Sequence, residues 1–157
     1  MFLTWDSSLR PTKYFIIFAF LLFFCLGFAP QPAEPRLKLD LFADKAIYHL
    51  REPVKMTLIV TNEGPQTISA VYSSSQSFDL AVFDQDRKEV WRWSNDKVFA
   101  QMLRPFTLPP GKEVRFSAAW KQADHYGNPV PKGKYYIQGW LALSPRKASP
   151  QKLIIIN

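Results

Sequence analysis

The chain has 157 residues, the length of one folded domain with an appendage. With 15% aromatic residues and 13 Pro against 6 Gly, it favours strands separated by Pro-marked turns over a helical bundle. The net charge of +7 would suit an acidic partner, but the basic residues are scattered along the sequence. Without a basic stripe that could follow phosphates, we expect no nucleic-acid partner.

The first expected element is an uncharged apolar segment at residues 14–29, preceded by Arg10 and Lys13. A helix of this length falls short of a hydrocarbon core of about 30 Å and matches the apolar region of a signal peptide. We therefore predict a signal peptide or short membrane anchor at residues 1–29 and a stiff Pro-rich spacer at residues 30–35. The basic residues before the segment predict an exported, extracytoplasmic protein, either secreted or anchored in the membrane through residues 14–29.

Residues that could carry chemistry are sparse. The one cysteine, Cys25, lies in the apolar segment, so the rest of the chain can form no disulfide, thiolate zinc site or cysteine nucleophile. His49 and His125 lack the spacing of zinc ligands. The carboxylates of Asp84 and Asp86 could suggest calcium, but a hairpin turn explains them more simply. Because no catalytic motif occurs, we expect no enzyme activity, no metal and no cofactor.

From residue 36 to the end, apolar and polar residues alternate, which predicts strands with one buried and one wet face. Turn signals separate the strands, so residues 36–157 are predicted to form an all-β domain. The expected fold is an immunoglobulin-like antiparallel two-sheet sandwich, preceded by the N-terminal hydrophobic helix. One short helix is expected at residues 95–103, because Asn95 can cap it and Val98, Met102 and Leu103 share a helical face. The expected inward-facing residues are Leu37, Leu39, Leu41, Val54, Met56, Leu58, Val60, Phe78, Leu80, Val82, Val114, Phe116, Ala118, Trp120, Tyr135, Ile137, Gly139, Leu141 and Leu143.

The first candidate for partner binding is the stretch V-W-R-W-S at residues 90–94. On a strand, Trp91 and Trp93 point to one face and Arg92 points to the other. The two indoles could form a platform for a sugar ring or a partner's side chain. The simpler interpretation places both indoles in the core and leaves Arg92 exposed.

The second candidate is the loop at residues 144–150, in which Arg146 and Lys147 lie between two prolines. The prolines restrict the loop to extended conformations and lower the cost of ordering it against a partner. A trypsin-like protease could accept Arg146 or Lys147 in its cleft. The simpler interpretation is an ordinary solvated connection.

Between Tyr48 and Gly139 the chain resembles the BsuPI-type intracellular proteinase inhibitors, a family of single all-β domains. The V-W-R-W-S stretch, with the Phe99 and Gln101 that follow it, is the most specific part of the resemblance. The resemblance implies the fold and a proteinase partner, and it assigns no inhibitory residue. Its motifs are Tyr48, Pro53-Val54, Val60-Thr61-Asn62, Ser75-Gln76-Ser77-Phe78-Asp79, Val90-Trp91-Arg92-Trp93-Ser94, Phe99-Ala100-Gln101, Leu108, Pro110-Gly111, Trp120, Asp124, Gly127, Pro131-Lys132-Gly133 and Tyr135.

Two functions are compatible with these features. The first is an extracytoplasmic protein-binding module, a proteinase inhibitor by resemblance, whose partner is a protein such as a serine protease. The alternative is a non-inhibitory cell-surface module for adhesion or for binding a wall polymer, in which the positive charge and any exposed tryptophan would matter. The oligomeric state is left open by the sequence.

Overall fold

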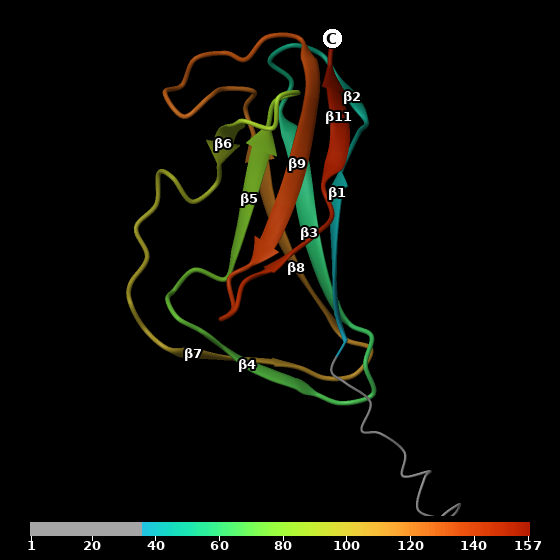
Figure 1. Cartoon of the computed structure of the whole chain (residues 1–157), viewed down its shortest axis with the longest axis vertical. Helices are drawn as coiled ribbons and strands as arrows, with labels where there is room; N and C mark the ends of the chain where they lie inside the picture. The colour runs from blue at the N-terminus through green and yellow to red at the C-terminus, as the bar shows by residue number, and fades with distance from the viewer. Residues whose placement is uncertain (1–35) are drawn as a thin grey trace, which may run out of the picture. The chain divides into compact units, whose positions relative to one another are not determined.

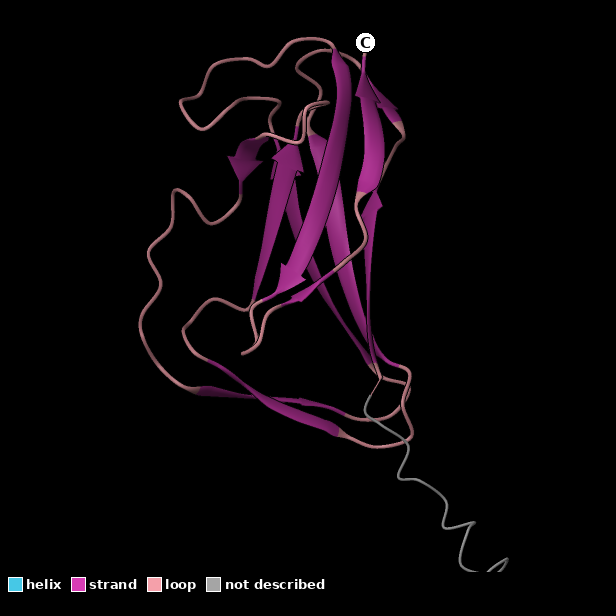
Figure 2. Ribbon diagram, in the orientation of Figure 1, coloured by secondary structure: helices cyan, strands magenta, loops and turns pink. Residues whose placement is uncertain are grey.

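The computed structural model describes residues 36–157. The predicted N-terminal helix, signal peptide or anchor, and spacer lie outside these residues. The described part of the chain is built from strands, turns and loops and contains no helix, which confirms the all-β prediction (Figure 2). Accordingly, no helix within residues 36–157 could cross a membrane. The strands are β1 (Leu37–Ala43), β2 (Ile47–Tyr48), β3 (Val54–Asn62), β4 (Ile68–Tyr72), β5 (Phe78–Phe83), β6 (Glu89–Arg92), β7 (Arg104–Leu108), β8 (Glu113–Trp120), β9 (Gly133–Leu141), β10 (Lys147–Ala148) and β11 (Lys152–Ile156).

The strands of residues 36–157 form three sheets rather than the predicted two. One sheet has the order β1-β3-β8, and the other large sheet has the order β2-β11-β9-β5-β6, with β10 also paired to β9. The third sheet is the pair β4-β7, which lies across one end of the other strands (Figure 1). All pairs are antiparallel except β2 with β11, which is parallel. The immunoglobulin-like arrangement stays a prediction.

The core lies between the two large sheets, as the period-two alternation predicts. On β3 every second residue from Val54 to Asn62 is buried, and β9 repeats this pattern from Tyr135 to Leu141. Across the core, a Cβ built on Gly139 would lie 2.9 Å from Leu58 Cδ1 and 3.1 Å from Leu80 Cδ2. The close approach of β9 to β3 and β5 therefore leaves no room for a side chain at this position. The core also takes in residues of the β4-β7 pair, namely Ile68, Tyr72, Phe106 and Leu108.

The predicted helix at Asn95–Leu103 is wrong. A turn occupies residues 93–96, and residues 97–103 have no regular structure. The apolar face that favoured a helix is not buried: Val98 is 100% exposed, Leu103 79% and Met102 47%. The segment is instead a long connection that joins β6 of one large sheet to β7 of the β4-β7 pair (Figure 1). We call residues 93–103 the 93–103 loop.

Candidate functional site

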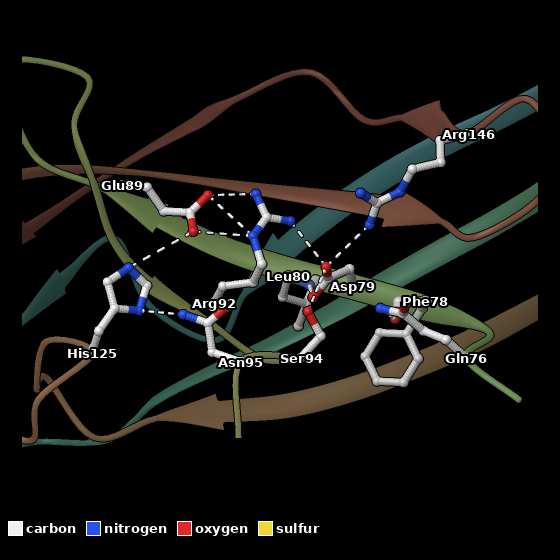
Figure 3. A network of polar contacts seen from close by, with 10 residues as sticks. All are labelled: Gln76, Phe78, Asp79, Leu80, Glu89, Arg92, Ser94, Asn95, His125 and Arg146. Atoms are coloured by element: carbon white, nitrogen blue, oxygen red, sulfur yellow. Dashed lines mark hydrogen bonds and ion pairs between the residues drawn. The ribbon is translucent and has the colours of Figure 1, made fainter. Parts of the chain in front are cut away.

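A buried carboxylate on β5 brings together the two arginines that the sequence singled out. Asp79 is 1% exposed, and its Oδ2 accepts hydrogen bonds from Arg92 Nη1 at 2.9 Å, Ser94 Oγ at 2.9 Å and Arg146 Nη2 at 3.0 Å (Figure 3). Its Oδ1 accepts the backbone N–H of Leu80 at 3.0 Å. Because each oxygen of the buried carboxylate has a hydrogen-bond donor, the cost of desolvating its charge is offset.

Arg92 is held from two sides. Its Nε donates to the carboxylate of Glu89 at 3.0 and 3.1 Å, its Nη2 also binds Glu89, and its guanidinium lies 4.8 Å from the ring centre of Trp140. Hydrogen bonding to Glu89, assisted by Asp79 and opposed by desolvation, raises the pKa of Arg92 above its ordinary value. The expectation of an exposed Arg92 is therefore wrong, since buried Asp79 and neighbouring Glu89 draw the side chain onto the sheet.

The same network reaches the start of the 93–103 loop. His125, in the connection between β8 and β9, has its Nε2 3.8 Å from Glu89 Oε1 and its Nδ1 2.6 Å from Asn95 Nδ2 (Figure 3). Ser94 and Asn95 are thus bound to Asp79 and His125, respectively, although neither belongs to a strand. The first residues of the loop are therefore fixed in place by side chains from other parts of the fold.

An aromatic stack lies beneath this part of the loop. The ring of Phe78 stacks on Trp93 at 4.2 Å between centroids and on Phe116 of β8 at 4.9 Å. Trp93 also contacts Phe99, at 6.0 Å between centroids. Aromatic rings bury large areas in specific geometries, so the stack links β5, β8 and the middle of the loop.

The far end of the loop is fixed by Arg104 and Ser75. The guanidinium of Arg104 donates to the carbonyls of Ser74 at 3.3 Å and Ser75 at 3.0 Å, and to Ser77 Oγ at 2.8 Å. The backbone of Ala100 is held by Ser75 alone: its N–H donates to Ser75 Oγ at 3.0 Å, and its C=O accepts the Ser75 N–H at 2.9 Å. The segment at residues 73–77 therefore acts as a brace for the second half of the loop.

Val98 lies between the attachments at residues 94–95 and at Ala100 and is wholly exposed. Its neighbours Lys97 and Phe99 both contact other side chains. The Nζ of Lys97 binds Asp96 Oδ1 at 2.6 Å and lies 4.7 Å from the ring centre of Trp93. Phe99 is half-buried against Trp93. At this point of the loop Val98 therefore faces solvent, while Lys97 and Phe99 on either side of it both contact Trp93.

A cavity of about 420 Å³ lies beside the start of the loop. Trp91, Trp93 and Lys97 line one side, and residues 117–121 of β8 and the following turn line the other. Trp91 and Trp93 also pack against the hydrophobic core. The two tryptophans are therefore partly buried against the core and also line an open cavity, and their role as a binding platform stays a prediction.

The predicted partner-binding residues thus lie in three places. Arg92 and Arg146 meet at Asp79, and Trp91 and Trp93 line the cavity, whereas Lys147 is exposed on β10 and makes no recorded side-chain hydrogen bond within residues 36–157. The residues missed from the sequence are those that bind the arginines, those that hold the loop, and the exposed Val98 within it. Of these, Asp79 and Ser75 lie in the S-Q-S-F-D motif. The occurrence of that motif together with V-W-R-W-S in the family resemblance is the sequence signal that could have pointed to them. The missed residues are Ser75, Asp79, Glu89, Ser94, Val98, Arg104 and His125.

Solved structures with a similar chain course share little sequence with this protein. A β-glucosidase from Erythrobacter marinus matches with a TM-score of 0.47 and 14% identity, over 78% of this chain and 16% of that one. The sporulation control protein Spo0M from Bacillus subtilis matches with a TM-score of 0.47 and 18% identity, over 77% of this chain and 49% of that one. The CARDB domain of a Pyrococcus furiosus protein matches with a TM-score of 0.45 and 12% identity, over 78% of this chain and 89% of that one. The chain therefore spans less than half of the first of these and about half of the second. No curated protein matches the sequence.

The family described as BsuPI, intracellular proteinase inhibitor, matches residues 41–146. This description contradicts the predicted extracytoplasmic location, because the family is named for inhibitors that act inside the cell. The apolar segment and its basic flank suggested export, but the match carries no support for a secreted or membrane-anchored protein. Inhibitor families of this kind are typically non-enzymatic.

The matched range runs from β1 to the residue before β10 and contains the Asp79 network, the aromatic stack and the whole 93–103 loop. It covers most of the described residues and all of the motifs on which the resemblance rested. The chain belongs to the BsuPI family of intracellular proteinase inhibitors.

Proposed function

We propose that this protein inhibits a proteinase by binding it through the 93–103 loop. The observation that supports this function is the attachment of the loop on both sides of an exposed residue. Val98 is 100% exposed, and two residues further on both backbone groups of Ala100 are hydrogen-bonded to Ser75. Residues 97–103 belong to no strand or helix, so a protease cleft could take up the backbone around Val98 without breaking a sheet.

The attachments distinguish an inhibitor from a substrate. A mobile loop loses conformational entropy when it enters a cleft, whereas a loop already held in shape loses less and binds more tightly. Proteins with few disulfides must hold such a loop by hydrogen bonds and packing. Here the Asp79 network holds the start of the 93–103 loop, and the aromatic rings of Phe78, Trp93 and Phe99 hold its middle. Arg104 holds its end.

The loop at residues 144–150 is a weaker candidate for the same role. The Arg146 side chain is 50% exposed, but its guanidinium donates to buried Asp79 and lies 5.8 Å from the ring centre of Trp140. Entry of Arg146 into a protease pocket would break these contacts, so Lys147 is the freer of the two basic residues. The alternative of a cell-surface adhesion module required an exported protein, and the family match removes that premise.

Arg104→Ala tests the proposed function most simply. The full-length chain is titrated against a panel of proteases, and the inhibition constant is compared with that of the variant. Because Arg104 fixes the end of the loop without being exposed at its tip, we expect inhibition about tenfold weaker and faster cleavage of the variant. The variant then behaves more as a substrate and less as an inhibitor.

Arg115→Ala is the matched control, since Arg115 is an exposed arginine on β8 that binds only Glu113 within residues 36–157. Thermal unfolding of both variants separates a loosened loop from a lost fold. Equal inhibition by the wild type and a folded Arg104→Ala variant would contradict a role for the loop. A wild-type chain that inhibits no protease in the panel would contradict the proposed function itself.

A further inference from the structure

Resting on the proposed function, we infer that the 93–103 loop presents the Val98–Phe99 peptide bond to the nucleophile of a serine protease whose specificity pocket is apolar. The side chain that enters such a pocket must be free of contacts with its own protein. Val98 meets this condition, because it is 100% exposed and is the most exposed of the large hydrophobic residues within residues 36–157. Burial of this side chain in an apolar pocket would remove its apolar surface from water and so favour binding.

The neighbours of Val98 do not meet the same condition. Lys97 would suit a trypsin-like pocket, but its ammonium group binds Asp96 and lies over the ring of Trp93. Phe99 is half-buried against Trp93. Of three consecutive residues, only the valine can leave the loop surface without breaking a recorded contact. The geometry thus selects an apolar pocket over a basic-residue pocket.

Leu103 and Met102 are exposed as well, at 79% and 47%, but they are poorly placed for cleavage. Leu103 directly precedes β7, whose residues Arg104–Leu108 are paired with β4. A protease must take several residues on each side of the cleaved bond into its cleft, and paired strand residues are not available for that. Both side chains lie downstream of Val98, where they would supply further apolar contact with the protease surface.

The attachments of Phe99 and Ala100 explain why the bond would resist hydrolysis. Attack by the serine Oγ on the Val98 carbonyl carbon, with its proton taken by the histidine, breaks the bond to the Phe99 nitrogen, which receives that proton. The products are a Val98 ester with the protease and a free Phe99 amine. The contact of the Phe99 ring with Trp93 and the two hydrogen bonds of Ala100 to Ser75 hold this amine beside the ester. It can then attack the ester, re-form the peptide bond and return the proton to the serine, which favours the intact inhibitor.

Val98→Arg in the full-length chain tests this assignment against two proteases, one with an apolar pocket that the wild type inhibits and one trypsin-like. An arginine at the residue that enters the pocket should weaken inhibition of the first about 100-fold and create inhibition of the second. Val71→Arg is the matched control. It places the same change at a valine that is 45% exposed on β4, outside the loop, and should leave both inhibition constants unchanged.

Mass spectrometry of the wild-type chain after long incubation with its protease gives an independent readout. A single cut between Val98 and Phe99 is expected. Inhibition by the wild type that is insensitive to Val98→Arg would overturn this inference and leave the proposed function intact. A first cut after Arg146 or Lys147 would overturn this inference and would also contradict the 93–103 loop as the binding segment. Absence of inhibition by the wild type would overturn both.

Discussion

At Asp79 a single carboxylate oxygen accepts hydrogen bonds from two guanidinium groups and a hydroxyl. Asp79→Ala should therefore be strongly destabilising, because it leaves half-buried Arg92 facing an apolar position without its partner. Removing one member of a buried ion pair costs about 3 kcal/mol or more. The free energy of unfolding from urea titration measures this loss.

Asp40→Ala provides the comparison at an exposed ion pair, since Asp40 binds Lys38 on the outer face of β1. Such surface pairs contribute little, so its urea midpoint should stay close to that of the wild type. If the two variants lost equal stability, the Asp79 network would have no special part in holding β5 to β6 and the 93–103 loop.

At the scale of elements, the turn at residues 124–128 depends on the charge of Asp124. Its Oδ1 accepts the backbone N–H groups of Tyr126 at 2.9 Å and Asn128 at 2.8 Å, and its Oδ2 accepts Asn128 Nδ2 at 3.1 Å. Desolvation raises the pKa of Asp124, but these hydrogen bonds outweigh it and hold the pKa below the ordinary 3.8. The turn carries His125, which meets the 93–103 loop at Asn95.

Because the folded-state pKa is lowered, the carboxylate stabilises the fold above the ordinary pKa of 3.8, and this contribution disappears as the pH falls through the folded-state value. Asp124→Asn keeps an acceptor oxygen and removes the charge. Its Tm should lie below that of the wild type at about pH 6, and the two should converge toward about pH 2. Asp86→Asn makes the same substitution at an exposed aspartate in another turn and is the matched control. A constant Tm difference across this range would contradict the assignment.

The regular strands could be predicted from the sequence because a period of two reports directly which face of a strand is buried. Leu58 and Ile137, assigned to the interior, are both fully buried. The 93–103 loop could not be predicted in this way. Val98, Met102 and Leu103 have helical spacing, but the chain there is held by Ser75 and Arg104, whose contacts depend on segments about 25–30 residues apart.

Only part of the candidate site could be predicted, again because its contacts join residues that are far apart in the sequence. Arg92 and Arg146 were recognised as basic residues in distinctive segments, yet their shared partner Asp79 lies 13 residues from one and 67 from the other. Alternation places Asp79 on the solvent face of β5, opposite Leu80. It is buried because two arginine side chains cover that face. A local sequence pattern does not predict contacts between residues this far apart in the sequence.

At the scale of the whole molecule, residues 36–157 contain a continuous core shared by all three sheets of this region. We expect residues 36–157, expressed alone, to give a β-dominated circular dichroism spectrum and one cooperative unfolding transition. A spectrum dominated by helix, or the absence of a cooperative transition, would show that the core described here is not sufficient for folding.

Binding of a proteinase through the 93–103 loop can be tested by hydrogen–deuterium exchange of the full-length chain. Exchange is measured alone and in complex with a protease that the chain inhibits. We expect protection on binding to be strongest in the peptides that cover residues 93–103 and their brace at residues 73–77. Protection centred on residues 144–150, with the 93–103 loop exchanging as in the free protein, would contradict it.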